Sequence, residues 1–320
     1  MTAFLFIGLI VNLALFAAPA SAQEVDTLRS ETIAAFAVPA SNTIKRTYEV
    51  SAGEFIVLDT DFGDVNVDSW DRNQVELVVE LTGNQDEIGR FALSMSKSGP
   101  IIHIKGTRKA RKLNLQWGWW SFGARFTIRV PREFSVTAKT REGRIMVRNL
   151  SGMIKLETLA GKIIGKHLTG ELAANTSGGD IKVNNVTGTI SLVSNTGDID
   201  IIDAFGVISM ASNSGDIKLS NAKAQVNANS REGDIEVNLS GKNQGIELNA
   251  DSGDIDIFLS PTVAGNLDAV TNNGHISMDA REGFNGNIKR RHVYGILNGG
   301  GTMIQAKTVS GSINIERQGR

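Results

Sequence analysis

Residues 179–219 read GDIKVNNVTGTISLVSNT (179–196), GDIDIIDAFGVISMASNS (197–214) and GDIKL (215–219). The triplet Gly-Asp-Ile returns after 18 residues each time, and a second glycine, Gly188 and then Gly206, returns at the same spacing. Self-similarity at a fixed period is the signature of a repeat architecture in which each unit stacks on the next. The rest of the chain can be interpreted by extending this period in both directions.

The extended period defines two short strands in each unit. The leading glycines are Gly143, Gly161, Gly179, Gly197, Gly215 and Gly233, followed less regularly by Gly253, Gly274 and Gly311. Apolar residues stand two and four positions after nearly every glycine, and seven and five positions before it. This period-two alternation indicates a strand on each side of a glycine turn. Small hydroxyl residues such as Thr176 and Ser194, three positions before the glycine, are expected to hydrogen-bond the turn backbone.

Identical residues that recur in register favour parallel stacking of successive units over a hairpin meander. An 18-residue unit is also too short for a propeller blade, which needs about 40 residues. The sequence therefore predicts an all-β fold, a β-solenoid with 18-residue coils. An earlier copy of the template, Ile56–Val67 with Gly63 at its turn, marks where the solenoid begins.

The predicted organisation has five parts. They are a signal peptide (1–22), an N-terminal linker (23–48), a first solenoid coil (49–74), an inserted strand-rich cap with one short helix (75–132) and the β-solenoid repeats (133–320). Asn84, followed by Glu87, is the expected start of that helix. The insertion is expected to cover the open end of the solenoid. The repeat blurs from Phe284 to Gly301, where a longer loop is expected.

The N-terminus indicates export. Residues 1–22 carry no charged side chain, are mostly apolar and end in Ala20-Ser21-Ala22, an A-x-A cleavage pattern. The missing Lys or Arg leaves an N-terminal membrane anchor as the alternative. No later stretch reaches the roughly 20 apolar residues of a spanning helix, so the mature chain is expected to have no transmembrane segment. It is expected in the periplasm, outside the cell or at the cell surface.

The composition excludes several classes of protein. The chain has no cysteine, which rules out disulfides, thiolate metal sites and cysteine nucleophiles. A formal net charge of -1 argues against a nucleic-acid binder that relies on a basic field. The four histidines have no metal-ligand spacing, and no zinc-protease, nucleophile-elbow or phosphate-loop motif is present. We therefore predict no catalytic residue, no metal and no cofactor.

Three segments carry a resemblance to a known family: the recurrent Gly-Asp-Ile, Phe126-Thr127-Ile128-Arg129-Val130-Pro131, and Thr308-Val309-Ser310-Gly311-Ser312-Ile313. Over about residues 45–320 the chain resembles the bacterial adhesin-like β-strand-repeat family, a domain-of-unknown-function family related to the head domain of proposed autotransporter adhesins. The resemblance implies a single-stranded right-handed parallel β-helix in the bacterial envelope, in a setting often linked to envelope stress. It brings no catalytic residue.

Two segments are candidate binding sites. In the first, Arg108 and Arg111 precede Trp117, Trp119 and Trp120, a combination that suits sugar rings, acidic polysaccharide or a membrane interface. The alternative is a hydrophobic plug over the first coil, flanked by basic residues. In the second, Arg290, Arg291, His292 and Tyr294 could neutralise a uronate and handle a proton, or form a solvated basic loop.

Asp180, Asp198, Asp216, Asp234 and Asp254 form a further ladder, one beside each turn. We expect these carboxylates to accept backbone hydrogen bonds, with calcium bridging as the alternative. Lys182, Asp200, Lys218 and Glu236 alternate in sign and are expected to pair between coils. The sequence thus favours an exported, non-enzymatic, adhesin-like envelope protein that binds an envelope polysaccharide or protein. The alternative is a binding module, lyase or hydrolase for acidic polysaccharide.

Overall fold

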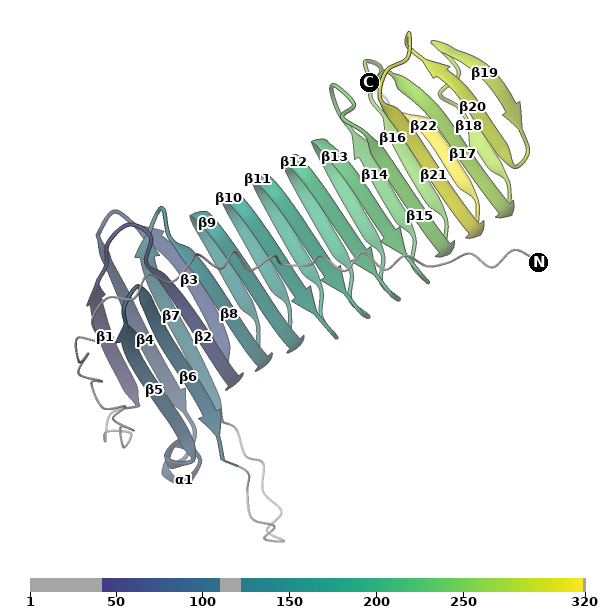
Figure 1. Ribbon diagram of the computed structural model, residues 1–320. Helices are drawn as coiled ribbons and strands as arrows, with labels where there is room; N and C mark the ends of the chain where they lie inside the picture. The colour runs from purple at the N-terminus through teal and green to yellow at the C-terminus, as the bar shows by residue number, and fades with distance from the viewer. Residues whose placement is uncertain (1–41, 110–121, 319–320) are drawn as a thin grey trace, which may run out of the picture. The chain divides into compact units, whose positions relative to one another are not determined.

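The computed structural model describes residues 42–109 and 122–318, all within one compact unit, Ile33–Arg320 (Figure 1). Among these residues the only helix is α1 (Gln85–Gly89), and no helix is long and apolar enough to cross a membrane. The strands are β1 (Thr43–Glu49), β2 (Phe55–Phe62), β3 (Asp64–Trp70), β4 (Gln74–Thr82), β5 (Phe91–Ser98), β6 (Ile101–Arg108), β7 (Gly123–Pro131), β8 (Ser135–Glu142), β9 (Ile145–Ala160), β10 (Ile163–Thr176), β11 (Ile181–Ser194), β12 (Ile199–Ser212), β13 (Ile217–Ser230), β14 (Ile235–Leu239), β15 (Ile246–Ser252), β16 (Ile255–Leu259), β17 (Gly265–Asn273), β18 (Ile276–Met278), β19 (Phe284–Lys289), β20 (His292–Leu297), β21 (Met303–Ser310) and β22 (Ile313–Arg317).

Strands β9–β13 form the regular part of the fold. Ile163 pairs in parallel with Ile181, and Thr176 with Ser194, so each partner lies 18 positions further along the chain. The same offset relates β9 to β10, β11 to β12 and β12 to β13. The predicted all-β fold, with consecutive repeats stacked in parallel, is confirmed.

Each of these long strands bends at a corner. Asn149, His167, Asn185, Asp203 and Asn221 have φ of 53–58°, a left-handed conformation that favours residues with short polar side chains. Some of these side chains also bond from coil to coil, as Asn185 Nδ2 does with His167 Nδ1 at 3.0 Å. Beyond the corner the strand continues to the next glycine turn. The two strand halves therefore contribute to two walls, one after the glycine and one before it.

The glycine turns stack directly on one another. A Cβ on Gly197 would lie 2.0 Å from the carbonyl oxygen of Gly179, so no larger residue fits at this contact. The predicted hydroxyl ladder is confirmed beside it. Thr176 Oγ1 donates to the Gly161 carbonyl at 3.3 Å and accepts from the Gly179 amide at 3.1 Å. Turn backbone that would otherwise be buried without partners is thus hydrogen-bonded.

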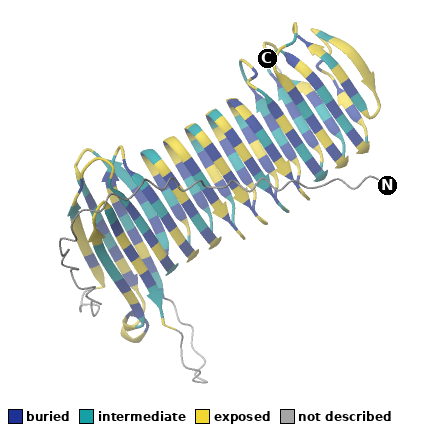
Figure 2. Ribbon diagram, in the orientation of Figure 1, coloured by how far each residue is buried: buried dark blue, intermediate teal, exposed yellow. Residues whose placement is uncertain are grey.

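The core lies between the two walls and is mostly aliphatic. In each wall the side chains alternate between buried and outward-facing, as the period-two pattern predicts (Figure 2). Ile181 and Val183 of one wall and Ile190 and Leu192 of the other are buried at the same coil. Burying each such side chain contributes roughly 1.5–3 kcal/mol.

The N-terminal end departs from chain order. Strand β2 lies between β6 and β8, and β3 lies between β7 and β9, all in parallel pairs. Beyond them, β4 and β5 pair antiparallel with β7 and β6, and β1 pairs antiparallel with β4. The first coil is therefore inside the stack, and antiparallel strands form the edge.

The C-terminal end departs from chain order in the same way. Strand β21 lies between β15 and β17, and β22 lies between β16 and β18. The last coil of the chain is therefore inserted before the coil that precedes it in sequence. An antiparallel hairpin, β19–β20, pairs with β17 and ends this wall.

Two segments differ from the sequence-based expectation. Residues 43–49, at the end of the segment expected to be a linker, form β1, whose side chains are mostly exposed. Backbone pairing with β4 holds this strand, and neither of its faces is buried as a whole. Its sequence therefore shows no apolar–polar alternation. The longer loop expected at 284–301 is wrong for most of its length, because β19 and β20 form a hairpin there. Only Val293 and Leu297 of this hairpin are buried, so its sequence contains too little apolar–polar alternation to indicate two strands.

Candidate functional site

The outward surface of β17, β20 and β21 is the main candidate site, which we name the C-terminal face. It consists of Asn266, Asp268, His292, Tyr294, Ile296 and Met303, which line a hollow of about 630 Å³. The strand register brings them together, because Tyr294 pairs with Asp268, and Asn266 pairs with both Ile296 and Met303. Since Val293 and Leu297 are buried, alternation along β20 directs His292, Tyr294 and Ile296 outward.

A polar group occupies the middle of this face. His292 Nε2 lies 2.9 Å from Asp268 Oδ1, and because an ionised carboxylate can only accept, Nε2 carries the hydrogen. The His292 and Tyr294 rings are 4.6 Å apart between centroids and inclined by 38°. Lys289 Nζ lies 5.9 Å from the Tyr294 ring centroid. This arrangement presents aromatic surface beside a cation and a hydrogen-bonding pair.

Two arginines occupy the β19–β20 turn next to this group. The Arg290 carbonyl accepts from the Ile276 amide at 2.8 Å, and the Arg291 carbonyl accepts from the Thr271 amide at 3.1 Å. The turn backbone is therefore fixed, while both side chains are exposed. Within the part of the chain that the structure describes, neither arginine nor Lys289 forms an ion pair. Three successive cations thus stand at one edge of the C-terminal face.

The first candidate segment is only partly described. Trp117, Trp119, Trp120 and Arg111 lie outside the described residues. Arg108 is described: its Nη2 lies 2.6 Å from Oε2 of the buried Glu87, and its guanidinium lies 4.8 Å from the Phe122 ring centroid. In this position Arg108 compensates a buried carboxylate and packs on an aromatic ring. The structure gives Arg108 a packing role next to α1, whose N-cap is Asn84, with the Asn84 side chain accepting from the Glu87 amide.

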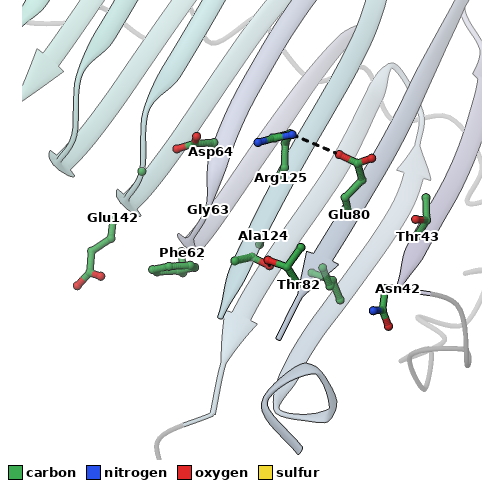
Figure 3. A pocket seen from close by; sticks show the side chains of 13 residues that line it. Asn42, Thr43, Phe62, Gly63, Asp64, Glu80, Thr82, Ala124, Arg125 and Glu142 are labelled. Carbon is green, nitrogen blue, oxygen red and sulfur yellow. Dashed lines mark hydrogen bonds and ion pairs between the residues drawn. The ribbon is translucent and has the colours of Figure 1, made fainter. Parts of the chain in front are cut away.

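A second hollow, of about 680 Å³, lies at the N-terminal end (Figure 3). Phe62, Asp64, Glu80 and Arg125 are among its lining residues, and Arg125 Nη1 lies 3.8 Å from Glu80 Oε2. Asp64 Oδ1 accepts from the Arg144 amide at 2.9 Å. Arg125 is thus paired with Glu80 and Asp64 is bonded to Arg144, so the charged groups of this hollow do not converge on one point (Figure 3).

The aspartate ladder bonds neighbouring coils to one another. Asp198 Oδ1 accepts from the Asp216 amide at 3.0 Å, Asp216 Oδ1 from the Asp234 amide at 2.9 Å, and Asp234 Oδ1 from the Asp254 amide at 2.7 Å. The expected backbone role is confirmed. The described residues contain no group of three acidic or histidine side chains arranged to hold a metal ion.

The predicted charge pairs between coils are also present. Lys182 Nζ lies 3.5 Å from Asp200 Oδ2, and Lys218 Nζ lies 2.8 Å from Glu236 Oε1. This pattern continues toward the N-terminal end on the outer surface of the same wall, the one that follows the glycines. Arg148 Nη2, for example, lies 2.9 Å from Asp68 Oδ2. Such exposed pairs each contribute about 0.2–1 kcal/mol and chiefly support the register of the coils.

Sequence reasoning identified part of the C-terminal face. It selected Arg290, Arg291, His292 and Tyr294, which the structure brings together. It missed Asn266, Asp268, Ile296 and Met303, which lie on three different strands. The template predicts that Asp268 faces outward, but it cannot reveal that β20 is its neighbour. That neighbour depends on the antiparallel pairing of β17 with β20, which lies outside the repeat.

The fold and its surface define a class of protein: a repeat protein built from a parallel, solenoid-like β-stack. The chain belongs to the Toastrack DUF4097 family, whose model matches residues 54–316. This agrees with the family resemblance inferred from the repeat. No curated protein matches the chain.

Several solved structures are similar to the chain at low identity. A proposed adhesin from Bacteroides fragilis is 15% identical, with 87% of this chain and 98% of that chain covered and a TM-score of 0.41. A proposed lipid-binding protein from Parabacteroides distasonis is 14% identical, with coverage of 86% and 97% and a TM-score of 0.42. A proposed cell adhesion protein from Clostridium sporogenes is 11% identical, with coverage of 86% and 99% and a TM-score of 0.22.

Proposed function

We propose that the protein is an exported, non-enzymatic, adhesin-like protein of the bacterial envelope, and that it holds a binding surface on a rigid β-solenoid. In this proposal the stack is a right-handed β-helix with 18-residue coils. The constant pairing offset in β9–β13 supports the coil length, and the adhesin-like class rests on the family resemblance of the repeat. Export rests on the pattern of residues 1–22, and a link to envelope stress rests on the resemblance alone.

One observation carries the proposal: the C-terminal face gathers aromatic, apolar and cationic side chains on backbone that is fixed by pairing on both sides. Strand β20 lies between β17 and β19, and the turn carbonyls are themselves hydrogen-bonded. A partner would meet these side chains without first ordering a loop, which reduces the entropic cost of binding. A surface of this kind suits binding of an envelope polysaccharide or envelope protein.

The test is binding of residues 23–320, which contain the whole compact unit, to isolated bacterial envelope fractions. We expect saturable binding that falls at least tenfold when Tyr294→Ser and Arg291→Gln are combined. The matched control is Val193→Ser with Lys166→Gln, two exposed positions on other coils. If both double variants bind as the parent does, the C-terminal face is not the binding surface.

A second candidate function is a binding module, lyase or hydrolase for acidic polysaccharide. The His292–Asp268 pair beside Tyr294 favours it, because these groups could hold and transfer a proton next to cations that neutralise a uronate. Incubation with a panel of acidic polysaccharides, with retention and release of new sugar ends recorded together, separates the cases. Cutting that Tyr294→Phe abolishes would establish an enzyme, whereas retention without cutting would establish a module.

The tryptophan segment remains a sequence-based proposal for a second contact. Replacing Trp119 and Trp120 by serine distinguishes its two interpretations. A hydrophobic plug would lose thermal stability, whereas a ligand surface would lose binding to envelope fractions at unchanged stability.

A further inference from the structure

Around its polar centre, the C-terminal face exposes large apolar side chains. Ile296 is 46% exposed and Met303 is 47% exposed, and both pair with Asn266, so the two aliphatic side chains flank the same residue. Tyr294, two positions from Ile296 on the same side of β20, is 38% exposed. Large apolar side chains gathered at one surface indicate a partner that removes them from water.

The charge beside this apolar surface is positive. Lys289, Arg290 and Arg291 are exposed and without ion pairs among the described residues, and Lys307 on β21 is also exposed. Asp268, the acidic residue on this face, is already hydrogen-bonded to His292. Charge complementarity therefore requires an anionic partner, with its negative groups at the β19–β20 turn and apolar material over Ile296 and Met303.

A lipid bilayer supplies both properties in one surface. Anionic headgroups attract clustered Lys and Arg, and aliphatic and aromatic side chains enter the boundary between headgroups and acyl chains. An acidic polysaccharide would also pair with the cations and could stack on Tyr294. It is hydrated, however, and offers no apolar layer to cover Ile296 and Met303. The aliphatic side chains thus favour lipid.

We propose that the C-terminal face docks on the surface of an anionic lipid bilayer. This names the partner of the surface described under the proposed function, and it rests on that function. The position of the face allows such contact, because among the described residues β19 pairs only with β20 and no further coil follows it (Figure 2). The outward side of β17, β20 and β21 is therefore bordered at this end by the β19–β20 hairpin alone, so no other described strand obstructs its approach to a membrane.

The experiment is co-sedimentation of residues 23–320 with vesicles of phosphatidylglycerol and phosphatidylcholine at 30:70, and with vesicles of phosphatidylcholine alone. The charge variant is Lys289→Gln, Arg290→Gln and Arg291→Gln. Its matched control is Lys105→Gln, Lys166→Gln and Lys242→Gln, three exposed cations elsewhere. The apolar variant is Ile296→Ser with Met303→Ser, which keeps every charge. Circular dichroism and thermal unfolding verify that each variant is folded.

We expect binding to the anionic vesicles only. Each cation near such a surface is worth about 1 kcal/mol, or roughly fivefold in affinity, so the charge variant should bind about a hundredfold more weakly. The control variant should lose far less, and raising the salt concentration should weaken the parent. The apolar variant should bind about tenfold more weakly and show a steeper salt dependence.

Two results would overturn the inference. The charge variant could bind vesicles no more weakly than its control, or the apolar variant could bind as tightly as the parent does while an acidic polysaccharide is retained instead. In the second case the C-terminal face still binds an envelope component, so the proposed function stands with a different partner. Loss of all binding to envelope fractions, measured in parallel, is the separate result that rejects the proposed function itself.

Discussion

Coils β9–β13 and the C-terminal strands β15–β22 use the same repeat, but they stack in different orders. In β9–β13 each coil lies on its predecessor in sequence. At the C-terminal end the turn of Gly311 stacks on Gly253, and Gly274 stacks on Gly311, as shown by Cβ positions that would fall 2.1 and 2.0 Å from the carbonyl oxygens below. The repeat therefore specifies how one coil packs on another, but it does not specify which coil becomes the neighbour at the ends of the stack.

Removing the inserted coil should have the largest effect. Truncation after Gly301 deletes β21 and β22, which separate β15 and β16 from β17 and β18. We expect hydrogen exchange in β17–β20 to lose nearly all protection, because β17 and β18 lose their parallel partners and the β19–β20 hairpin is attached through β17. Coils β9–β13 should remain protected, since stability in stacked repeats comes from neighbouring units.

The control is a truncation after Ile315, which keeps β21 and most of β22. Equal loss of protection in β10 and in β17 after the longer truncation would contradict a locally organised end and would indicate one cooperative unit.

The next largest effect should come from the stacked glycines of the regular coils. Gly197→Ala places a Cβ 2.0 Å from the Gly179 carbonyl oxygen and 2.3 Å from its carbon, so one coil must shift against the other. We expect a loss of about 3–5 kcal/mol in the free energy of unfolding, or no folded protein. Gly89→Ala is the control, because no atom beyond its chain neighbours and its own helix backbone lies within 4 Å of its added Cβ. Denaturant unfolding measures both; comparable losses would refute the close contact.

Much of the regular stack could be predicted from the sequence, because each position in the coil has one physical requirement. Glycine is needed at the close contact, a small hydroxyl at the buried turn, and aliphatic residues at two positions in each strand. The order at the ends could not be predicted, since Gly253, Gly274 and Gly311 all satisfy the same template.

The site was predictable to a smaller extent for a related reason. Arg290 and Tyr294 were selected by residue type, whereas the places of Ile296 and Met303 follow from the antiparallel pairing of β20 with β17 and from the inserted strand β21. The left-handed corner was also missed, although Asn149, Asn185 and Asn221 recur in step with the glycines. Their signal was the enrichment of asparagine in left-handed backbone.

The hydroxyl ladder should give an intermediate effect. Thr176→Val keeps the shape of the side chain but leaves the Gly179 amide and the Gly161 carbonyl without this partner. We expect a loss of about 1–3 kcal/mol, while Thr176→Ser should lose less because it keeps the hydroxyl. Thermal unfolding distinguishes them, and equal losses for valine and serine would mean that the methyl group matters more than the hydrogen bonds.

The smallest effect should be electrostatic, at the antiparallel N-terminal edge. The hydrogen bond from Lys45 lowers the pKa of Glu76 against the opposing effect of burial, and Lys45 Nζ lies 2.6 Å from Glu76 Oε2. Because the pKa is lowered in the folded state, the stabilisation is complete above the usual glutamate pKa of about 4.3 and is lost as the pH falls through the lowered value.

We expect this contribution to be below about 1 kcal/mol, as for other ion pairs with an exposed partner. Unfolding of the parent and of Glu76→Gln, compared between pH 7 and pH 3, measures it. The difference between the two proteins should shrink toward acid pH. A difference that grows instead would show that the pair destabilises this edge.

The inserted terminal coils also determine how the protein responds to tension along its chain. A pull on the end of β22 acts on a strand that is hydrogen-bonded to β16 on one side and to β18 on the other. Two ladders therefore share the load, and the strand cannot be peeled away from a free edge one bond at a time. At the other end, β1 can peel from β4, but the force then reaches β2, which is held between β6 and β8. A protein anchored at one end and attached to a surface at the other would thus resist unfolding from its terminal strands, where the force is applied.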